Sequence, residues 1–110
     1  MILTVYVIAD IEITDDSWVA DYGANVHDIV AKHGGEYLSR SGNIINAAGE
    51  GPNSNMIAII KFPSVDAVQG FVGDPEYAPY GKAREDGSNS IIRIIDDTDV
   101  AGGIPYLPKG

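Results

Sequence analysis

The sequence predicts a single α+β domain in which strands and helices follow the order β-α-β-β-α-β. Residues 3–13 alternate apolar and polar side chains with the period of two that is typical of a strand. Residues 16–33 repeat apolar side chains every three or four positions, which indicates an amphipathic helix. Residues 56–72 then join an apolar strand directly to a second helix, so the strand-to-helix pattern occurs twice.

Clear turn signals bound the first half of the domain. The Thr-Asp-Asp-Ser cluster at 14–17 is typical of a turn and a helix N-cap. Gly34 and Gly35 are expected to end the first helix, because glycine adopts the left-handed C-cap conformation without a steric clash. A short second strand is predicted at 36–40.

The second half begins with a segment rich in turn-forming residues. Residues 41–55 contain many Gly, Asn and Ser side chains, and we expect a hairpin connection with a weak strand at Ile44–Ile45. The remaining elements are expected as a third strand at 56–62, a second helix capped by Ser64, a short helix over 76–86 and a fourth strand at 90–96.

This element order is the split βαβ, or ferredoxin-like, pattern with a four-stranded antiparallel sheet. Right-handed crossovers place the helices on one face of the sheet and leave the other face uncovered. That face is expected to expose Ile8, Ile92 or Ile94. We therefore predict a homodimer in which two sheets pack together around a barrel-like interior. The domain is expected over 1–97, with an extended C-terminal tail at 98–110.

Composition limits the classes of partner. The chain of 110 residues suits one domain, and its 7 basic and 16 acidic residues give a net charge of −9. Such a charge repels phosphate backbones and anionic lipids, so we expect neither nucleic acid nor membrane as a partner. The absence of cysteine excludes disulfides, thiol catalysis and zinc–thiolate sites. Without a signal-peptide or membrane-span pattern, a cytoplasmic location is expected.

Two segments carry a resemblance to a known family. They are His33-Gly34-Gly35-Glu36-Tyr37-Leu38 with Arg40, and Phe62-Pro63-Ser64 followed by Asp74-Pro75-Glu76-Tyr77 with Arg84. Over about residues 3–97 the chain resembles the family named domain of unknown function 1330, which belongs to the dimeric α/β-barrel superfamily. The resemblance implies a ferredoxin-like dimer, with a pocket for a small organic substrate either between helices and sheet or inside the barrel.

The resemblance also implies a range of activities. Relatives in the superfamily include cofactor-free monooxygenases, isomerases, dehydratases and polyketide cyclases. Members of the family often carry an arginine just before the third strand, and this chain has Asn55 near that position.

Three side chains are candidates for catalysis. Asp10 shares the second face of the first strand with Tyr6, and burial in a pocket would raise its pKa and make it a usable base. His33 ends the first helix, where it either interacts with the helix dipole or acts as an acid or base. Arg40 is suited either to an oxyanion or to a structural ion pair.

The candidate substrate-binding residues are mostly aromatic. An apolar ring with one polar group suits a flat, partly apolar ligand, although the same residues also serve in cores. Arg84 adds a positive charge that would suit either a substrate anion or an internal ion pair. The candidates are Tyr6, Trp18, Tyr22, Tyr37, Tyr77 and Arg84.

No cofactor or metal site is expected from the sequence. The chain has no His/carboxylate spacing typical of a metal site, and no GxGxxG, P-loop or GxSxG motif.

Three functions fit these patterns. The leading hypothesis is a cofactor-independent enzyme that uses proton transfer for the cyclisation, isomerisation or dehydration of a carbonyl, polyketide-type substrate. Asp10 or His33 would move the proton, while Arg40 and Tyr6 stabilise the oxyanion. The alternatives are a cofactor-free monooxygenase, in which a substrate carbanion reacts with oxygen, and a non-catalytic ligand-binding or accessory protein.

Overall fold

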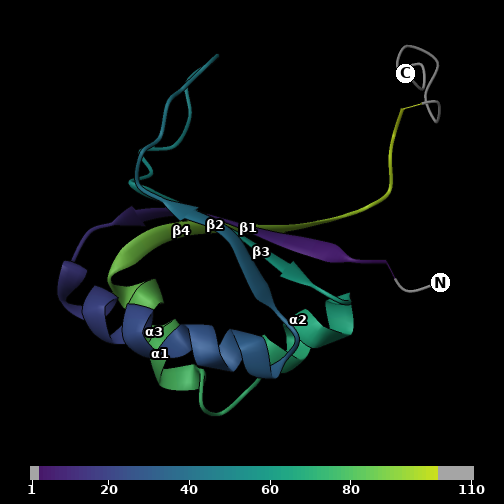
Figure 1. The fold of residues 1–110 in the computed structure, drawn as a ribbon. Coiled ribbons are helices and arrows are strands. Elements are labelled where there is room, and N and C mark those ends of the chain that lie inside the picture. Colours follow the sequence, from purple (N-terminus) through teal and green to yellow (C-terminus); the bar gives the residue numbers. More distant parts are fainter. Residues whose placement is uncertain (1–2, 102–110) are drawn as a thin grey trace.

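The computed structural model describes residues 3–101 and consists of one sheet covered on one side by helices (Figure 1). In chain order the elements are β1 (Val5–Ile13), a 3-10 turn η1 (Asp16–Trp18), α1 (Val19–Lys32), β2 (Glu36–Ser41), β3 (Met56–Phe62), α2 (Val65–Val72), α3 (Ala78–Asp86) and β4 (Ser88–Asp96).

The four strands form an antiparallel sheet in the order β2-β3-β1-β4. The first strand is central, because β1 pairs with both β3 and β4 along most of its length. The predicted α+β, ferredoxin-like fold is confirmed, with the short helix at 76–86 present as α3.

Local signals in the sequence determine where the helices begin and end. The Ser64 hydroxyl accepts a hydrogen bond from the Ala67 amide at 3.0 Å, so the predicted N-cap of α2 is present. Gly34 has a φ of 80°, a left-handed conformation in which glycine avoids a Cβ clash, and it directly follows the end of α1.

The predicted weak strand at Ile44–Ile45 is wrong. Residues 43–48 have no strand conformation, and the connection between β2 and β3 projects away from the sheet on the side opposite the helices (Figure 1). Only its base is tied to the sheet, where the Asn55 amide donates to the Ile11 carbonyl at 2.9 Å. An isolated segment rich in Gly and Asn has no strand beside it to complete a ladder.

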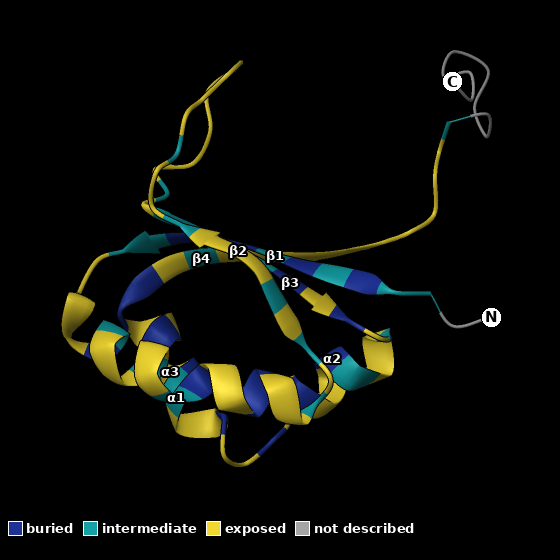
Figure 2. Cartoon of the chain, viewed as in Figure 1, coloured by how far each residue is buried: buried dark blue, intermediate teal, exposed yellow. Residues whose placement is uncertain are grey.

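The main core lies between the sheet and the helices, towards one end of the domain. Burial is concentrated on the helix-facing side of the strands and on the inner faces of α1 and α2 (Figure 2). Phe62 is 0% exposed and packs with Val5, Val26, Val30 and Phe71. The alternation of β1 is as predicted, because its apolar positions from Val5 to Ile11 are buried.

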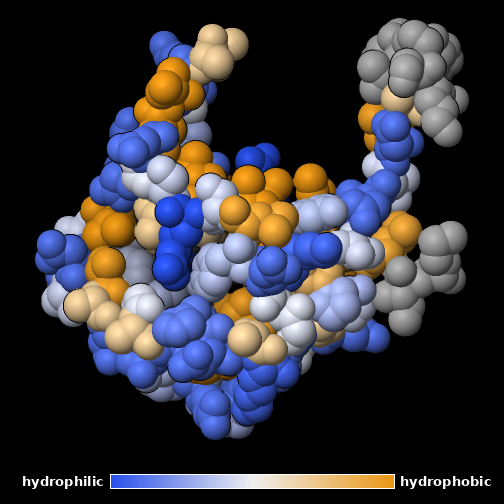
Figure 3. All heavy atoms as spheres, viewed as in Figure 1, coloured by the Kyte–Doolittle hydropathy of each residue, from blue (hydrophilic) through white to orange (hydrophobic). Residues whose placement is uncertain are grey.

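The opposite face of the sheet is apolar and uncovered in the single chain. In the space-filling view, hydrophobic side chains gather along the upper side of the sheet (Figure 3). Register places Ile91 and Ile95 on this face, opposite Asp10 and Tyr6, and they are 48% and 55% exposed.

Two residues predicted for this face lie on the other one. Register aligns Ile92 with Ala9 and Ile94 with Val7, so both face the helices. Both alternations of the Ile-Ile-Arg-Ile-Ile segment contain two isoleucines, and the single Arg93 is a weak guide to which face is covered. Only the pairing with β1 decides which isoleucines face the helices.

Two sequence predictions concern the ends of the chain and its location. The predicted tail at 98–110 lies largely outside the described residues, and within them the last strand ends at Asp96. None of the helices in residues 3–101 has the length and apolar character needed to span a bilayer. The cytoplasmic location stays a prediction.

Replacement of Gly35 by alanine should destabilise the fold. A Cβ atom at this position would lie 2.5 Å from Val30 Cγ1 and 2.7 Å from Phe62 Cε1, inside the main core. We expect a loss of about 1–3 kcal/mol in the free energy of unfolding, measured by thermal denaturation with circular dichroism.

The matched control for this prediction is Gly23→Ala in α1, where a Cβ meets nothing within 4 Å. Because alanine is the better helix former, this variant should gain up to about 1 kcal/mol. Equal stability of the two variants would contradict the packing argument.

Candidate functional site

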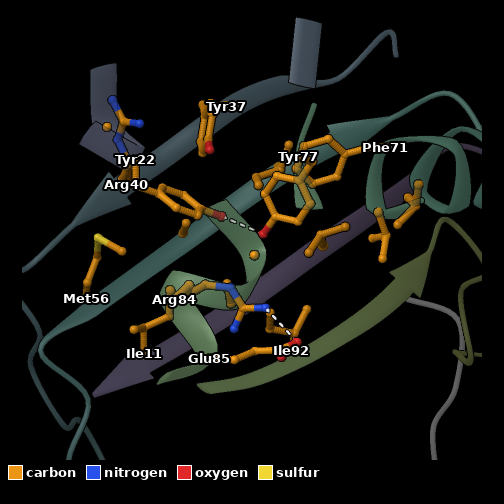
Figure 4. Close-up of a pocket in the computed structure, with 18 of the residues that line it drawn as sticks. Ile11, Tyr22, Tyr37, Arg40, Met56, Phe71, Tyr77, Arg84, Glu85 and Ile92 are labelled. Atoms are coloured by element: carbon orange, nitrogen blue, oxygen red, sulfur yellow. Dashed lines mark hydrogen bonds and ion pairs between the residues drawn. The ribbon is translucent and has the colours of Figure 1, made fainter. Parts of the chain in front are cut away.

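A cavity of about 710 Å³ lies between the helices and the sheet, inside a single chain (Figure 4). Of the two locations that the sequence left open, the structure has the one between helices and sheet. Six of the residues proposed from the sequence line it or its mouth. They are Trp18, Tyr22, Tyr37, Arg40, Tyr77 and Arg84.

Small residues create the space for this cavity. Ala9 and Ala58 are directly paired across β1 and β3 and form part of its floor. On α3, Gly81 faces the cavity, and a Cβ there would lie 2.9 Å from the ring of Tyr77. The large core side chains around Phe62 fill the other end of the domain, so the unfilled volume remains where these small residues meet.

Arg84 is the buried charge of the cavity. Its side chain is only 10% exposed, and no hydrogen-bond partner for Nε occurs in residues 3–101. The nearest carboxylate is that of Glu85, 3.9 Å from Nη2, and this acid is itself 71% exposed. A buried guanidinium without a close counterion is a site where an anionic group of a ligand would be stabilised.

The end of α3 determines the position of Arg84. The Gly87 carbonyl accepts hydrogen bonds from the indole of Trp18, at 3.1 Å, and from the backbone amide of Thr14, at 2.9 Å. A Cβ at Gly87 would collide with the Trp18 ring, so this close approach requires glycine. The junction ties the end of α3 to the turn after β1 and directs the preceding helical turn inwards.

Tyrosine hydroxyls lie beside the arginine. The hydroxyls of Tyr22 and Tyr77 are 2.8 Å apart and share a hydrogen bond. Burial, together with the adjacent Tyr77, raises the pKa of Tyr22 well above its usual range, so this phenol stays protonated. Burial alone would lower the pKa of Arg84, but the neighbouring Tyr77, Tyr22 and Glu85 together outweigh it and the net shift is upwards. The site therefore combines a buried cation with a hydrogen-bonded pair of tyrosine hydroxyls.

A second arginine stands at the β2 side of the cavity. The guanidinium carbon of Arg40 is 4.7 Å from the centroid of the Tyr37 ring, which is a cation–π contact. Register pairs Arg40 with Ala58, on the same face as the cavity floor. Burial raises the pKa of Tyr37, and the charge of Arg40 partly opposes this shift.

Charge is distributed unevenly between this cavity and the rest of the chain. Within residues 3–101 the basic side chains that line it are Arg40, Lys82 and Arg84, and the acidic one is Glu85. The whole chain has 7 basic and 16 acidic residues. In a chain of net charge −9, this concentration of positive charge favours an anionic ligand.

Asp10 and Tyr6 lie on the opposite face of the sheet, outside this cavity. The Ser54 hydroxyl donates to Asp10 at 2.6 Å, and the Tyr6 hydroxyl donates to Asp97 at 2.8 Å. Asp10 instead lines a second, more polar cavity of about 500 Å³ beside β4. Arg84 and Glu85 line this second cavity as well, so Arg84 stands between the two. The structure does not bring Asp10 or Tyr6 together with the tyrosines of the first cavity.

His33 also lies away from the cavity, in an ion cluster that joins α1 to the segment before α3. Its Nε2 is 2.7 Å from Asp74 Oδ2, and Lys32 Nζ donates to the same oxygen at 2.9 Å. The Asp74 side chain is 5% exposed. In residues 3–101 no group of three or more potential ligands is arranged to hold a metal ion.

Among the lining residues that sequence reasoning missed are Met56, Gly81, Lys82 and Glu85. Two of them carried a usable signal, since Gly81 and Glu85 follow Tyr77 by four and eight residues and so share one helix face with it. Met56 and Lys82 had no local signal, because their proximity to the cavity depends on how β3 and α3 pack.

The fold resembles three solved structures at low sequence identity. A protein of unknown function from Rhodopseudomonas palustris, RPA0582, has a TM-score of 0.74 at 14% identity, over 90% of this chain and 85% of that one. SnoaB, a cofactor-independent oxygenase from Streptomyces nogalater, has a TM-score of 0.64 at 12% identity, over 88% of this chain and 95% of that one. A proposed antibiotic biosynthesis monooxygenase from Caulobacter crescentus has a TM-score of 0.57 at 14% identity, over 89% of this chain and 92% of that one.

Sequence comparison gives one further finding. The profile of the family described as domain of unknown function (DUF1330) matches residues 4–98. No curated protein sequence matches the chain.

The ion cluster predicts a pH dependence of stability. The His33 and Lys32 side chains hold the pKa of Asp74 well below its usual range, so its stabilising contribution is complete at neutral pH. That contribution should be lost as pH falls from about 5 to about 2, because the unfolded carboxyl then binds a proton more readily. Urea denaturation of wild type and Asp74→Asn should show a stability difference that shrinks over this range.

The control for this prediction is Asp28→Asn, whose side chain is 83% exposed. The stability difference between wild type and Asp28→Asn should not shrink in this way as pH falls. A stability difference between wild type and Asp74→Asn that stays constant at every pH would contradict the role of the ion cluster.

Proposed function

The chain belongs to the DUF1330 family, and on that premise we propose that it is a cofactor-independent oxygenase acting on a flat, enolisable small molecule. The observation that carries the proposal is the buried guanidinium of Arg84, which has an unpartnered Nε and faces an apolar cavity. An enolate or phenolate oxygen of the substrate would complete the ion pair that the chain itself does not supply.

The cavity has the size and lining for such a substrate. Its volume of about 710 Å³ lies within the range for small-molecule sites, and aromatic and aliphatic side chains provide most of its surface. In the hydrogen-bonded pair of Tyr22 and Tyr77 one hydroxyl donates to the other, and the second hydroxyl would donate to the substrate oxygen beside the guanidinium, where negative charge develops.

Arg84 would favour ionisation of the bound substrate, because it stabilises the anion relative to the neutral form, and the released proton would pass to water at the cavity mouth. The carbanionic carbon would then form a C–O bond with O₂, and the resulting peroxide would take up one proton. Loss of the remaining C–H proton and cleavage of the O–O bond would give a carbonyl group and one water molecule. The substrate supplies all the electrons, so a methylene group and O₂ become a ketone and water.

Two observations favour oxygenation over the proton-transfer hypothesis. Asp10 and His33, which that hypothesis uses as proton carriers, lie outside the cavity and have partners of their own. The similarity of the fold to SnoaB, which is described as a cofactor-independent oxygenase, also supports the oxygenase proposal.

We further propose that the protein is a homodimer through the uncovered face of the sheet. Register places Tyr6, Ile8, Ile91 and Ile95 on this face, and the fold is that of the dimeric α/β-barrel superfamily. A patch of exposed isoleucines on a small domain is typical of an interaction surface.

The oxygenase proposal predicts oxygen consumption with an enolisable three-ring ketone such as anthrone, whose ionisation gives a flat aromatic enolate. An oxygen electrode should record one O₂ consumed per ketone, and ¹⁸O₂ should place one label in the product. Arg84→Gln should lower kcat/KM about 100-fold, because the oxyanion loses its charged donor.

Arg93→Gln is the control, since it removes the same charge from the uncovered face of the sheet, outside the cavity. Because this face is the proposed dimer interface, the variant is used only with its oligomeric state checked against wild type. Turnover that proceeds without oxygen would instead support the proton-transfer hypothesis. Saturable binding without conversion of any enolisable probe would support a binding protein.

The dimer proposal predicts that wild type has twice the mass of one chain in light scattering coupled to gel filtration. Ile95→Asp places a charge on the uncovered face and should give monomers. Val65→Asp adds the same charge on α2, at a residue 45% exposed, and should remain dimeric. A monomeric wild type would overturn the proposal.

A further inference from the structure

We propose that the substrate carries a carboxylate in addition to its enolate or phenolate, and that Arg40 binds this carboxylate. The inference rests on the proposed function, because it takes the anionic oxygen at Arg84 as given. It assigns the substrate to a chemical class, the flat carboxylic acids that also carry an enolisable ketone or its phenol tautomer.

The two arginines approach the cavity from different sides. Arg40 is on β2, one edge of the sheet, and Arg84 lies beside Ile92 of β4, the other edge. Three strand spacings separate these edges, or about 14 Å between strand axes. In the close-up, the hydroxyls of Tyr22 and Tyr77 lie between the two guanidinium groups (Figure 4). A single flat molecule lying across the cavity floor would therefore extend from one arginine towards the other.

Arg40 is available to a ligand. Within residues 3–101 no carboxylate lies within ion-pair distance of it, although the chain has 16 acidic residues. Its guanidinium stacks over the ring of Tyr37. A stacked guanidinium keeps its in-plane N–H groups free, and these match the two oxygens of a carboxylate.

The surroundings of the two arginines suit different anions. Arg84 is buried beside neutral phenols, an environment that favours a single oxyanion formed from a weakly acidic enol or phenol. Arg40 is exposed at the cavity mouth, where a fully ionised carboxylate keeps part of its hydration while it binds. The floor between them, with Ala9 and Ala58, is apolar and suits the face of an aromatic ring.

The test compares two probes that differ by one carboxylate, 2-naphthol and 6-hydroxy-2-naphthoic acid. Fluorescence titration gives both Kd values, and the naphtholate absorption band reports ionisation of the hydroxyl at Arg84. Wild type should bind the acid about tenfold more tightly than 2-naphthol, from one charge-assisted contact at a partly exposed site.

The variants separate this inference from the proposed function. Arg40→Gln should abolish the preference for the acid and keep the naphtholate band, and Arg40→Lys should restore part of the preference. Arg84→Gln should remove the naphtholate band with both probes. Arg93→Gln, with its oligomeric state checked, should behave like wild type.

Two results would overturn the inference alone. They are equal affinity of wild type for the two probes, and an Arg40→Gln variant that keeps the tenfold preference. In both cases a naphtholate band that forms in wild type and is lost in Arg84→Gln would still support the proposed function. A naphtholate band that never forms in wild type, or that persists in Arg84→Gln, would count against the proposed function itself. If Arg40→Gln does not fold, the two probes with wild type and Arg40→Lys still decide the question.

Discussion

The burial of a guanidinium without a close counterion is the constraint on which the rest of this structure depends. Arg84 faces the sheet because it shares a helix face with Tyr77 and Gly81, and because the indole of Trp18 donates a hydrogen bond to the carbonyl of Gly87 at the end of α3. A charge removed from bulk water has to be solvated by dipoles or by an opposite charge. The surrounding core therefore does not close tightly around it, and the chain keeps a cavity beside this group.

The cavity divides the small domain into two parts with different physical roles. At one end, Phe62 and Phe71 pack with the valines of β1 and α1, and this cluster supplies most of the apolar burial. At the other end, Ala9, Ala58 and Gly81 leave space that larger side chains would fill. A domain of this size gains limited stability from a single core, which is consistent with a further contribution from the apolar face of the sheet.

The placement of polar residues determines which chemistry the cavity supports. Its titratable lining consists of arginines, tyrosines, Lys82 and Glu85, while His33 and Asp10 are held by other partners elsewhere. Such a lining is better suited to stabilise an anion than to carry protons between carbon atoms. Reaction of a stabilised carbanion with oxygen then needs little further from the protein beyond binding and exclusion of water.

The sequence by itself determined the elements and their faces wherever the side-chain period was clear. The bounds of β3, the cap at Ser64 and the buried alternation of β1 follow from local patterns. Only the tertiary structure decided the face of the isoleucines in β4, which occur in both alternations of the strand, and the placement of Arg40 and Arg84 around one cavity. Local patterns show which residues share a face of one element. Whether that face encloses a cavity depends on contacts between distant segments, here the β1–β4 register and the junction of Trp18 with Gly87.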